Sequence, residues 1–301
     1  MLNIIQNRKI WLTFSGILVA LSIASLSFWG LNFGIDFTGG SLLEVEFSGY
    51  QPAITDIQDS LRNVGASNLV IQPTQSGTTL LRFKESTQEV HQAINASLSK
   101  LATDHKGSAK ELRFDSIGPS IGNELKSKSF NAVIVVLLAM VAFIAFAFRK
   151  VSKPVASWKY GMAAIVALAH DVIVVLGVFS VLGHFLGTEV NTAFIAAVLT
   201  VLGYSVNDTI IVFDRTRENL PKSSQDFENT VNTSVNQVLT RSINTSFSAI
   251  LALLAILFFG GSSIRDFALA LAVGIFVGTY SSIFIASPMI VIWEKMGKKR
   301  A

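Results

Sequence analysis

A carboxylate inside an apolar stretch is the feature of this sequence with the strongest chemical implication. Asn207 and Asp208 interrupt a segment that otherwise has membrane-spanning character and that ends in the charged run Asp-Arg-Thr-Arg-Glu at residues 214–218. A charged side chain at the centre of a bilayer costs about 2.5–3.5 kcal/mol or more, so it usually lines a cavity, meets a partner or moves protons. Asp208 is therefore the residue that most constrains function.

A second polar pair, His170 and Asp171, interrupts the preceding apolar segment. Adjacent positions on a helix point about 100° apart, so the two side chains cannot face one site equally. Asp171 is a candidate relay or gating carboxylate, and His170 is a candidate for the same role. The alternative for Asp171 is a structural polar contact with another helix.

Two polar stripes lie on successive helices at helical spacing. One face of the fourth apolar segment carries Tyr204, Asn207, Asp208 and Ile211. One face of the next segment carries Arg241, Asn244, Thr245 and Ser248. Both stripes are predicted in the cytoplasmic half of the membrane, so an Asp208–Arg241 pair is geometrically plausible. Asn244 is retained as a further candidate for relay or gating.

A pair of Asp208 with Arg241 would be suited to proton transfer. Burial disfavours the charged form of a carboxylic acid, whereas a nearby guanidinium favours it. Because arginine stays protonated, the aspartate is the member that carries the proton. We expect Asp208 to load and release protons as Arg241 approaches and withdraws, with Asn207 and Tyr204 supplying hydrogen bonds or organising water. The alternative is a structural ion pair that locks the two helices together.

These residues lie in a chain whose composition is that of an integral membrane protein. Half of the 301 residues are hydrophobic and 15% are charged, against roughly a quarter charged in a soluble domain. About 20 apolar residues span a bilayer. Six stretches qualify, at 10–31, 129–148, 160–183, 190–213, 242–261 and 267–293. The first is expected to be a retained helix, since its apolar run is too long for a typical signal peptide.

The basic residues of the short loops predict the orientation of the chain. With six helices, the clusters of lysine and arginine fall on one side of the membrane, at residues 8–9, 149–159, 215–222 and 295–300. The short loops on the other side hold Arg265 as their single fixed positive charge. Both termini are therefore expected in the cytoplasm, with residues 32–128 outside it.

Two further segments carry packing signals. Ser224 opens a predicted amphipathic helix that is expected to lie on the membrane surface, with an apolar face of Phe227, Val231, Val235 and Val238. In the last span, small residues recur at every fourth position, at Ala270, Gly274, Gly278 and Ser282. Such a stripe favours close approach of another helix, in this chain or in a partner.

Residues 32–128 are far more polar and have the pattern of a small folded domain. Strands are predicted at 41–47, 68–72, 78–84 and 111–116, with helices at 52–64 and 86–101. The order β-α-β-β-α-β suggests a ferredoxin-like split unit. The predicted fold is thus an α-helical polytopic membrane protein with one α+β ferredoxin-like domain, divided into residues 1–31, 32–128 and 129–301.

Other chemistries have little support in the sequence. The chain has no cysteine, which excludes disulfides and thiolate metal sites, and its four histidines are too dispersed to form a metal site. It has no nucleotide-binding loop and no catalytic triad, so we expect no enzymatic activity, no cofactor and no metal. The net charge of +4 is explained by the placement of loops, so no nucleic-acid partner is expected. An intramembrane aspartyl protease would need two carboxylates, but the contexts here are His-Asp and Asn-Asp, not the Tyr-Asp and Gly-x-Gly-Asp of those proteases.

The motifs of this chain resemble those of the SecD/SecF family of bacterial protein-export subunits, which are relatives of the resistance-nodulation-division transporters. The resemblance rests on the runs Gly34-Ile-Asp-Phe-Thr-Gly-Gly40, Gly203-Tyr-Ser-Val-Asn-Asp208 and Phe213-Asp-Arg215, with further agreement at 117–125, at His170-Asp171 and at 240–246. The single short outer domain and the run from Val206 to Arg215 favour the SecF branch of the family.

The resemblance implies a role in the bacterial cell inner membrane. A SecF-like subunit works with SecD and uses the proton-motive force to help unfolded preproteins leave the SecYEG translocon, among membrane lipids, on the periplasmic side. The resemblance also links the positions of Asp208 and Arg241 to proton movement. It places the turn with Gly34, Asp36, Gly39 and Gly40 at the junction of membrane and outer domain, where Asp36 is expected to be architectural and a coupling role stays open.

Two alternatives to this function are kept. Related transporters act as stand-alone ion-driven exporters of small molecules or lipids, but those chains generally have about twelve spans, and a half of six should need a partner half. A non-conducting scaffold for translocon assembly would keep the outer domain and the helix packing but would not require Asp208 to titrate.

Overall fold

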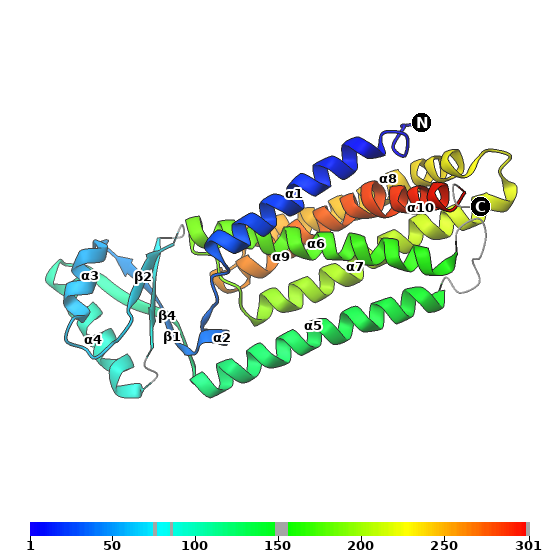
Figure 1. The fold of residues 1–301 in the computed structure, drawn as a ribbon. Helices are drawn as coiled ribbons and strands as arrows, with labels where there is room; N and C mark the ends of the chain where they lie inside the picture. The colour runs from blue at the N-terminus through cyan, green and yellow to red at the C-terminus, as the bar shows by residue number, and fades with distance from the viewer. Residues whose placement is uncertain (75–76, 85–86, 148–155, 299–301) are drawn as a thin grey trace. The chain divides into compact units, whose positions relative to one another are not determined.

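The computed structural model describes residues 1–74, 77–84, 87–147 and 156–298 (Figure 1). The chain forms two compact units, one of residues 33–130 and one of residues 1–32 together with 131–301. The basic residues predicted at Arg149, Lys150, Lys153, Lys299 and Arg300 lie outside the described residues.

Six long apolar helical runs account for the predicted spans. They are α1 (Arg8–Trp29), α5 (Pro119–Ala147), α6 (Ser157–Leu186), α7 (Thr192–Asn219), α8 (Phe227–Phe259) and a last run of α9 (Ser262–Ser281), the π-helical turn η2 (Ser282–Ala286) and α10 (Ser287–Lys298). In the described part of the chain, six helices are long and apolar enough to cross a membrane. The six predicted segments are therefore confirmed as long apolar helices.

The structure differs from the sequence prediction at the start of α8. The segment expected as a separate helix on the membrane surface is instead continuous with the fifth span. Its apolar residues Phe227, Val231 and Val235 are buried in the protein, because α8 packs on α7, α9 and α10. An apolar helix face satisfies either environment, and here the neighbouring helices cover it.

The small residues of α9 allow this helix to lie very close to α7. A Cβ atom added at Gly274 would lie 2.2 Å from a methyl carbon of Val201, and one added at Gly278 would lie 2.9 Å from Cβ of Ser205. A side chain at Gly274 would therefore require the Val201 side chain or the helix itself to shift. The predicted small-residue stripe is used within this chain, against the fourth span.

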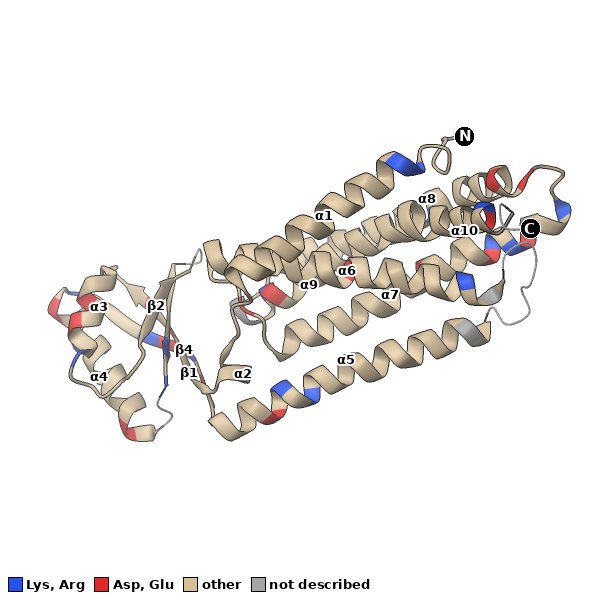
Figure 2. Cartoon of the chain, viewed as in Figure 1, with Lys and Arg blue, Asp and Glu red and all other residues tan. Residues whose placement is uncertain are grey.

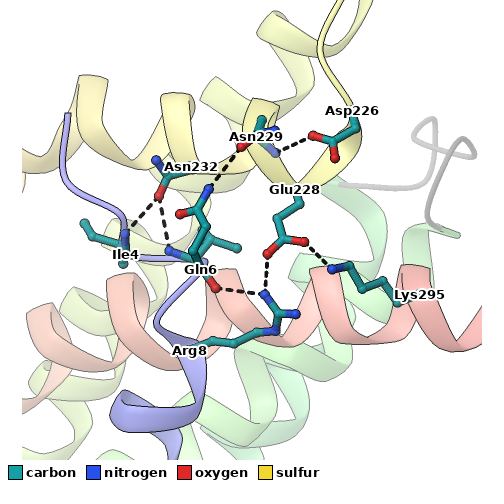
Figure 3. A network of polar contacts seen from close by, with 9 residues as sticks. Ile4, Gln6, Arg8, Asp226, Glu228, Asn229, Asn232 and Lys295 are labelled. Atoms are coloured by element: carbon teal, nitrogen blue, oxygen red, sulfur yellow. Dashed lines mark hydrogen bonds and ion pairs between the residues drawn. The ribbon is translucent and has the colours of Figure 1, made fainter.

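Polar contacts tie the N-terminal segment to the start of α8 (Figure 3). The side-chain oxygen of Asn232 accepts hydrogen bonds from the backbone N–H groups of residues 4–5, at 3.0 and 3.1 Å. Glu228 forms ion pairs with both Arg8 of α1 and Lys295 of α10. These contacts hold the ends of α1, α8 and α10 together.

The second unit is a small sheet with two helices. Its elements follow the order β1 (Gly40–Ser48), α3 (Ile54–Leu61), β2 (Val70–Pro73), β3 (Thr78–Phe83), α4 (Gln88–Asp104) and β4 (Ser108–Ile117). The strands lie in the order β2-β3-β1-β4, and each neighbouring pair is antiparallel. Alternate residues of β1, among them Leu43 and Val45, join α3 and α4 in the core. The order of strands and helices is the one that the sequence pattern predicts.

Candidate functional site

Asp208 lies on α7 with both carboxylate oxygens bound by hydroxyl groups. The side chain is buried, with 6% of its surface exposed. Its Oδ1 accepts a hydrogen bond from Ser242 of α8, and its Oδ2 accepts one from Ser282 at the start of η2, each at 2.5 Å. Three helical runs therefore meet at this carboxylate.

Asp171 on α6 forms a second site of the same kind. It is fully buried, and its Oδ2 accepts hydrogen bonds from Ser205 of α7 at 2.6 Å and from Ser281 of α9 at 2.8 Å. Its Oδ1 lies 3.0 Å from Nδ1 of the adjacent His170. The two carboxylates are thus bound by consecutive serines, Ser281 and Ser282, of the last helical run.

His170 connects Asp171 to an apolar groove. The groove has a volume of about 350 Å³ and is lined by residues of α1, α6, η2 and α10, with His170 and Ser15 as its polar members. Nε2 of His170 is buried and has no hydrogen-bond partner among the described residues. His170 therefore faces the groove and binds Asp171, so the two adjacent side chains share one polar site after all.

A chain of hydroxyl groups continues from the Asp208 site. Tyr204 Oη lies 3.1 Å from Oγ of Ser246, and Ser246 lies 2.5 Å from Oγ1 of Thr279. Ser246 also donates a hydrogen bond to the carbonyl of Ser242. Tyr204 is therefore part of the polar interior, but it binds Ser246 and does not contact the carboxylate.

The structure does not form the Asp208–Arg241 pair that the sequence makes plausible. Among the described residues, neither Asp208 nor Arg241 takes part in an ion pair, and Arg241 is exposed on the outer side of α8. The neighbouring Ser242 takes the position facing Asp208, because consecutive helical residues point about 100° apart. Asn207 and Asn244 are exposed as well, so the structure places them outside the buried site.

Sequence reasoning missed the serines that bind the two carboxylates. They are Ser205, Ser242, Ser281 and Ser282. In the sequence, Ser282 stands out only as a member of the small-residue stripe, and Ser281 has no distinguishing pattern. A pair of serines inside an apolar span is a weak signal, since serine is common in close helix contacts.

The backbone geometry of the glycine-rich turn in the other unit requires glycine at two positions. It forms α2 (Ile35–Thr38), which Gly34 precedes and Gly39 and Gly40 follow. Both following glycines have positive φ, 71° and 117°, which other residues rarely adopt. A Cβ at Gly39 would lie 2.9 Å from Cα of Pro119, and one at Gly40 would lie 2.8 Å from a backbone oxygen. Asp36 lies within this short helix.

Both sites are buried carboxylates that accept hydrogen bonds from serine hydroxyls, and His170 lies beside Asp171. Among the residues that the structure describes, no group of three or more His, Cys, Asp or Glu side chains could hold a metal ion. A serine hydroxyl donates one hydrogen bond and also accepts, so it can satisfy either a carboxylate or a carboxylic acid. The arrangement therefore suits a carboxyl group that gains and loses a proton.

The chain matches two family models. The model described as protein export membrane protein SecD/SecF, C-terminal, matches residues 96–296, and the SecD/SecF GG motif matches residues 24–49.

Close relatives and solved structures agree with these models. The chain is 40% identical to protein translocase subunit SecF of Thermobaculum terrenum and 39% identical to that of Anaerolinea thermophila, in each case over 98% of this chain and 94% of the relative. A crystal structure of SecDF, a translocon-associated membrane protein from Thermus thermophilus, is 35% identical with a TM-score of 0.83. It covers 98% of this chain, whereas the chain spans only 39% of that longer protein.

Proposed function

The chain belongs to the SecD/SecF family of protein-export membrane proteins, and we propose that it works with SecD to convert proton flow into late preprotein translocation. A SecF-like subunit of the Sec translocase is the function that its relatives' names support. The relatives' names do not extend to the proton-driven mechanism or the individual partners, which we propose from the site.

The observation that carries the proposal is the pair of buried carboxylates. Asp208 and Asp171 lie inside apolar helices and are bound by hydroxyl groups and one histidine, without a fixed cation. A buried charge without an opposite charge is expensive, so these groups are expected to exchange protons. Binding of a proton at Asp208 would then bias the packing of α7 against α8 and η2, since the serines of those elements contact it.

The outer face of α8 supports a SecD partner. The polar stripe predicted there is exposed, with Arg241, Asn244, Thr245 and Ser248 all on the surface of this chain. An arginine facing lipid is costly, so we infer that a second membrane subunit covers this face. The matched SecDF protein extends well beyond the 39% of its length that aligns with this chain, and we infer that SecD covers the polar face of α8. Arg241 would then contact SecD, while the adjacent Ser242 binds Asp208.

The distribution of charge supports the predicted orientation. In the helical unit, charged side chains gather at the end where α1 begins and α10 ends (Figure 2). Arg8 begins α1, and Arg215 and Lys295 lie near the ends of α7 and α10. We therefore propose that this end faces the cytoplasm of a bacterium and that residues 32–128 form a ferredoxin-like periplasmic domain. There the domain would meet preprotein emerging from SecYEG, while membrane lipids surround the helices.

The proposal is tested with inverted membrane vesicles that contain the Sec translocon. Export of a labelled preprotein is measured with the proton gradient intact and after its collapse, in vesicles with this chain and SecD and in vesicles that lack either one. We expect a gradient-dependent increment that requires both subunits. An increment of the same size without this chain would contradict the proposal. Stimulation that persists after collapse of the gradient would favour the scaffold, and small-molecule export without SecD would favour the stand-alone exporter.

A further inference from the structure

The last membrane helix changes to a π-helical turn at the level of the two buried carboxylates. The turn covers Ser282–Ala286 and is followed by Pro288 in the first turn of α10. Proline has no N–H to donate to the preceding turn and its ring crowds the carbonyl four residues earlier, which accounts for the interruption. Ser287 donates its hydroxyl to the carbonyl of Ser282 at 2.9 Å, five residues before it. Single π-turns inside α-helices are frequent at functional sites.

The two serines at the junction of α9 and this turn, Ser281 and Ser282, each have two hydrogen-bond acceptors. Ser281 lies 2.8 Å from Oδ2 of Asp171 and 3.1 Å from the carbonyl of Gly278. Ser282 lies 2.5 Å from Oδ2 of Asp208 and 3.0 Å from the carbonyl of Thr279. A hydroxyl carries one proton, so each serine donates mainly to the carboxylate or mainly to its own helix.

The second acceptor allows each serine hydroxyl two hydrogen-bonding arrangements, one for each protonation state of the carboxyl group. Beside a charged carboxylate, the hydroxyl donates to it. Beside a protonated carboxylic acid, the serine oxygen accepts the acid proton, and its own hydrogen turns to the backbone carbonyl. Both serines are fully buried, so water does not take over either role. Because the two serines are consecutive, a change in backbone bonding at one alters the turn that holds the other.

The turn packs against α1, α6, α7, α9 and α10, and α8 reaches Asp208 through Ser242; the titratable and charged groups beside the site come from four of these helices. They are His170 beside Asp171 on α6, Tyr204 near Asp208 on α7, Arg241 beside Ser242 on α8, and Tyr280 of α9, whose hydroxyl binds Ser15 of α1. Of these, His170 is in direct contact with one of the carboxylates. The serine pair is the element that contacts both.

We propose that the turn at Ser281–Ser282 couples the protonation of Asp171 to that of Asp208, so that the two carboxylates exchange protons as one unit. Asp171 is then a second proton-carrying group, and the serines are positioning residues that link it to the first. The inference rests on the proposed proton-driven function and deepens it, because it assigns the means by which two sites on different helices act together.

The test is infrared difference spectroscopy of the carboxyl bands of the full chain, purified with SecD and held in lipid nanodiscs. The Asp208 band is assigned by its loss in Asp208→Asn, and its pH midpoint is followed. Coupled groups influence each other's midpoints by about one pH unit or more, so we expect a shift of that size on Asp171→Asn. In the Ser281→Ala/Ser282→Ala background, the same change should shift the midpoint by less than a third as much.

Two controls make the test specific. The Ser281→Thr/Ser282→Thr variant keeps both hydroxyls and should retain the coupling, even if the alanine pair does not fold. Ser180→Ala removes a buried hydroxyl of α6 that contacts neither carboxylate, and it should leave the coupling unchanged. An equal shift with and without the serine hydroxyls would overturn the proposal, as would the absence of any shift in the wild type. Since no preprotein is present, this result is independent of whether export responds to the gradient.

Discussion

Replacement of Asp208 by asparagine removes the charge at the centre of the site and keeps its shape. The amide retains one acceptor oxygen, so one serine bond survives as a bond between neutral groups, and the amide N–H can meet the oxygen of the other serine. Hydrogen bonds to a charged group contribute about 1.5–3 kcal/mol, against about 0.5–1.5 kcal/mol between neutral groups. A neutral amide is also less costly to bury than a carboxylate.

These two effects oppose each other, so we expect Asp208→Asn to change the free energy of unfolding by at most about 3 kcal/mol. The chain should therefore accumulate at a normal level and associate with SecD, which a pull-down and a thermal unfolding curve in detergent would verify. Its gradient-dependent increment of preprotein export should be lost, while the export that remains after collapse of the gradient should be unchanged.

The matched control for this variant is Asp214→Asn on the same helix. Asp214 is partly exposed at the end of α7 and forms an ion pair with Arg217. A surface pair of this kind contributes about 0–1 kcal/mol, so its loss should leave gradient-dependent export intact. The reasoning fails if Asp208→Asn, at normal level and with SecD bound, still shows the full increment. It also fails if both variants lose the increment equally.

Three further perturbations test other parts of the structure. Gly274→Ala places a methyl group against Val201 and should lower the free energy of unfolding by about 1–3 kcal/mol. The matched Gly16→Ala change should not, because apart from its chain neighbours and its own helix backbone no atom lies within 4 Å of the new Cβ. Unfolding curves in detergent that coincide for the two variants would be inconsistent with the close helix contact. Arg241→Gln should change the unfolding free energy by less than about 0.5 kcal/mol, because the side chain is exposed, yet it should weaken co-purification with SecD, and unaltered SecD binding would argue against that interface. Glu228→Gln should loosen the N-terminal segment, so that proteases cut before α1 more rapidly than in the wild type; an unchanged cleavage rate would mean that its two ion pairs do not hold the segment.

The spans and the order of elements could be predicted because their signals are local. Twenty apolar residues identify a membrane helix wherever the chain later packs, and alternation identifies a half-buried strand such as β1. The prediction that the start of α8 is a separate helix on the membrane surface is wrong for a related reason. An apolar stripe shows that a face is covered, but it does not show whether lipid or protein covers Val231 and Val235.

The sequence predicts the two carboxylates of the site but not the serines that bind them. Asp208 and Asp171 are conspicuous because carboxylates are rare in apolar helices, and that signal needs no knowledge of packing. Their partners depend on which helices meet, since Ser282 is 74 residues from Asp208 and Ser281 is 110 residues from Asp171. The sequence also does not show which residue of α8 faces Asp208. Arg241 and Ser242 are adjacent, and in the structure Ser242 faces the carboxylate.

The central claim is that protons move through this subunit as preprotein is exported, and a proton-flux measurement tests it most directly. A pH-sensitive dye would report proton movement in inverted vesicles that contain the translocon, SecD and this chain, on addition of preprotein and with either a proton or a sodium gradient imposed. The account predicts preprotein-dependent proton flow with the wild type and none with Asp208→Asn. Export that is stimulated by a sodium gradient alone, or that proceeds at the full rate without proton flow, would contradict it.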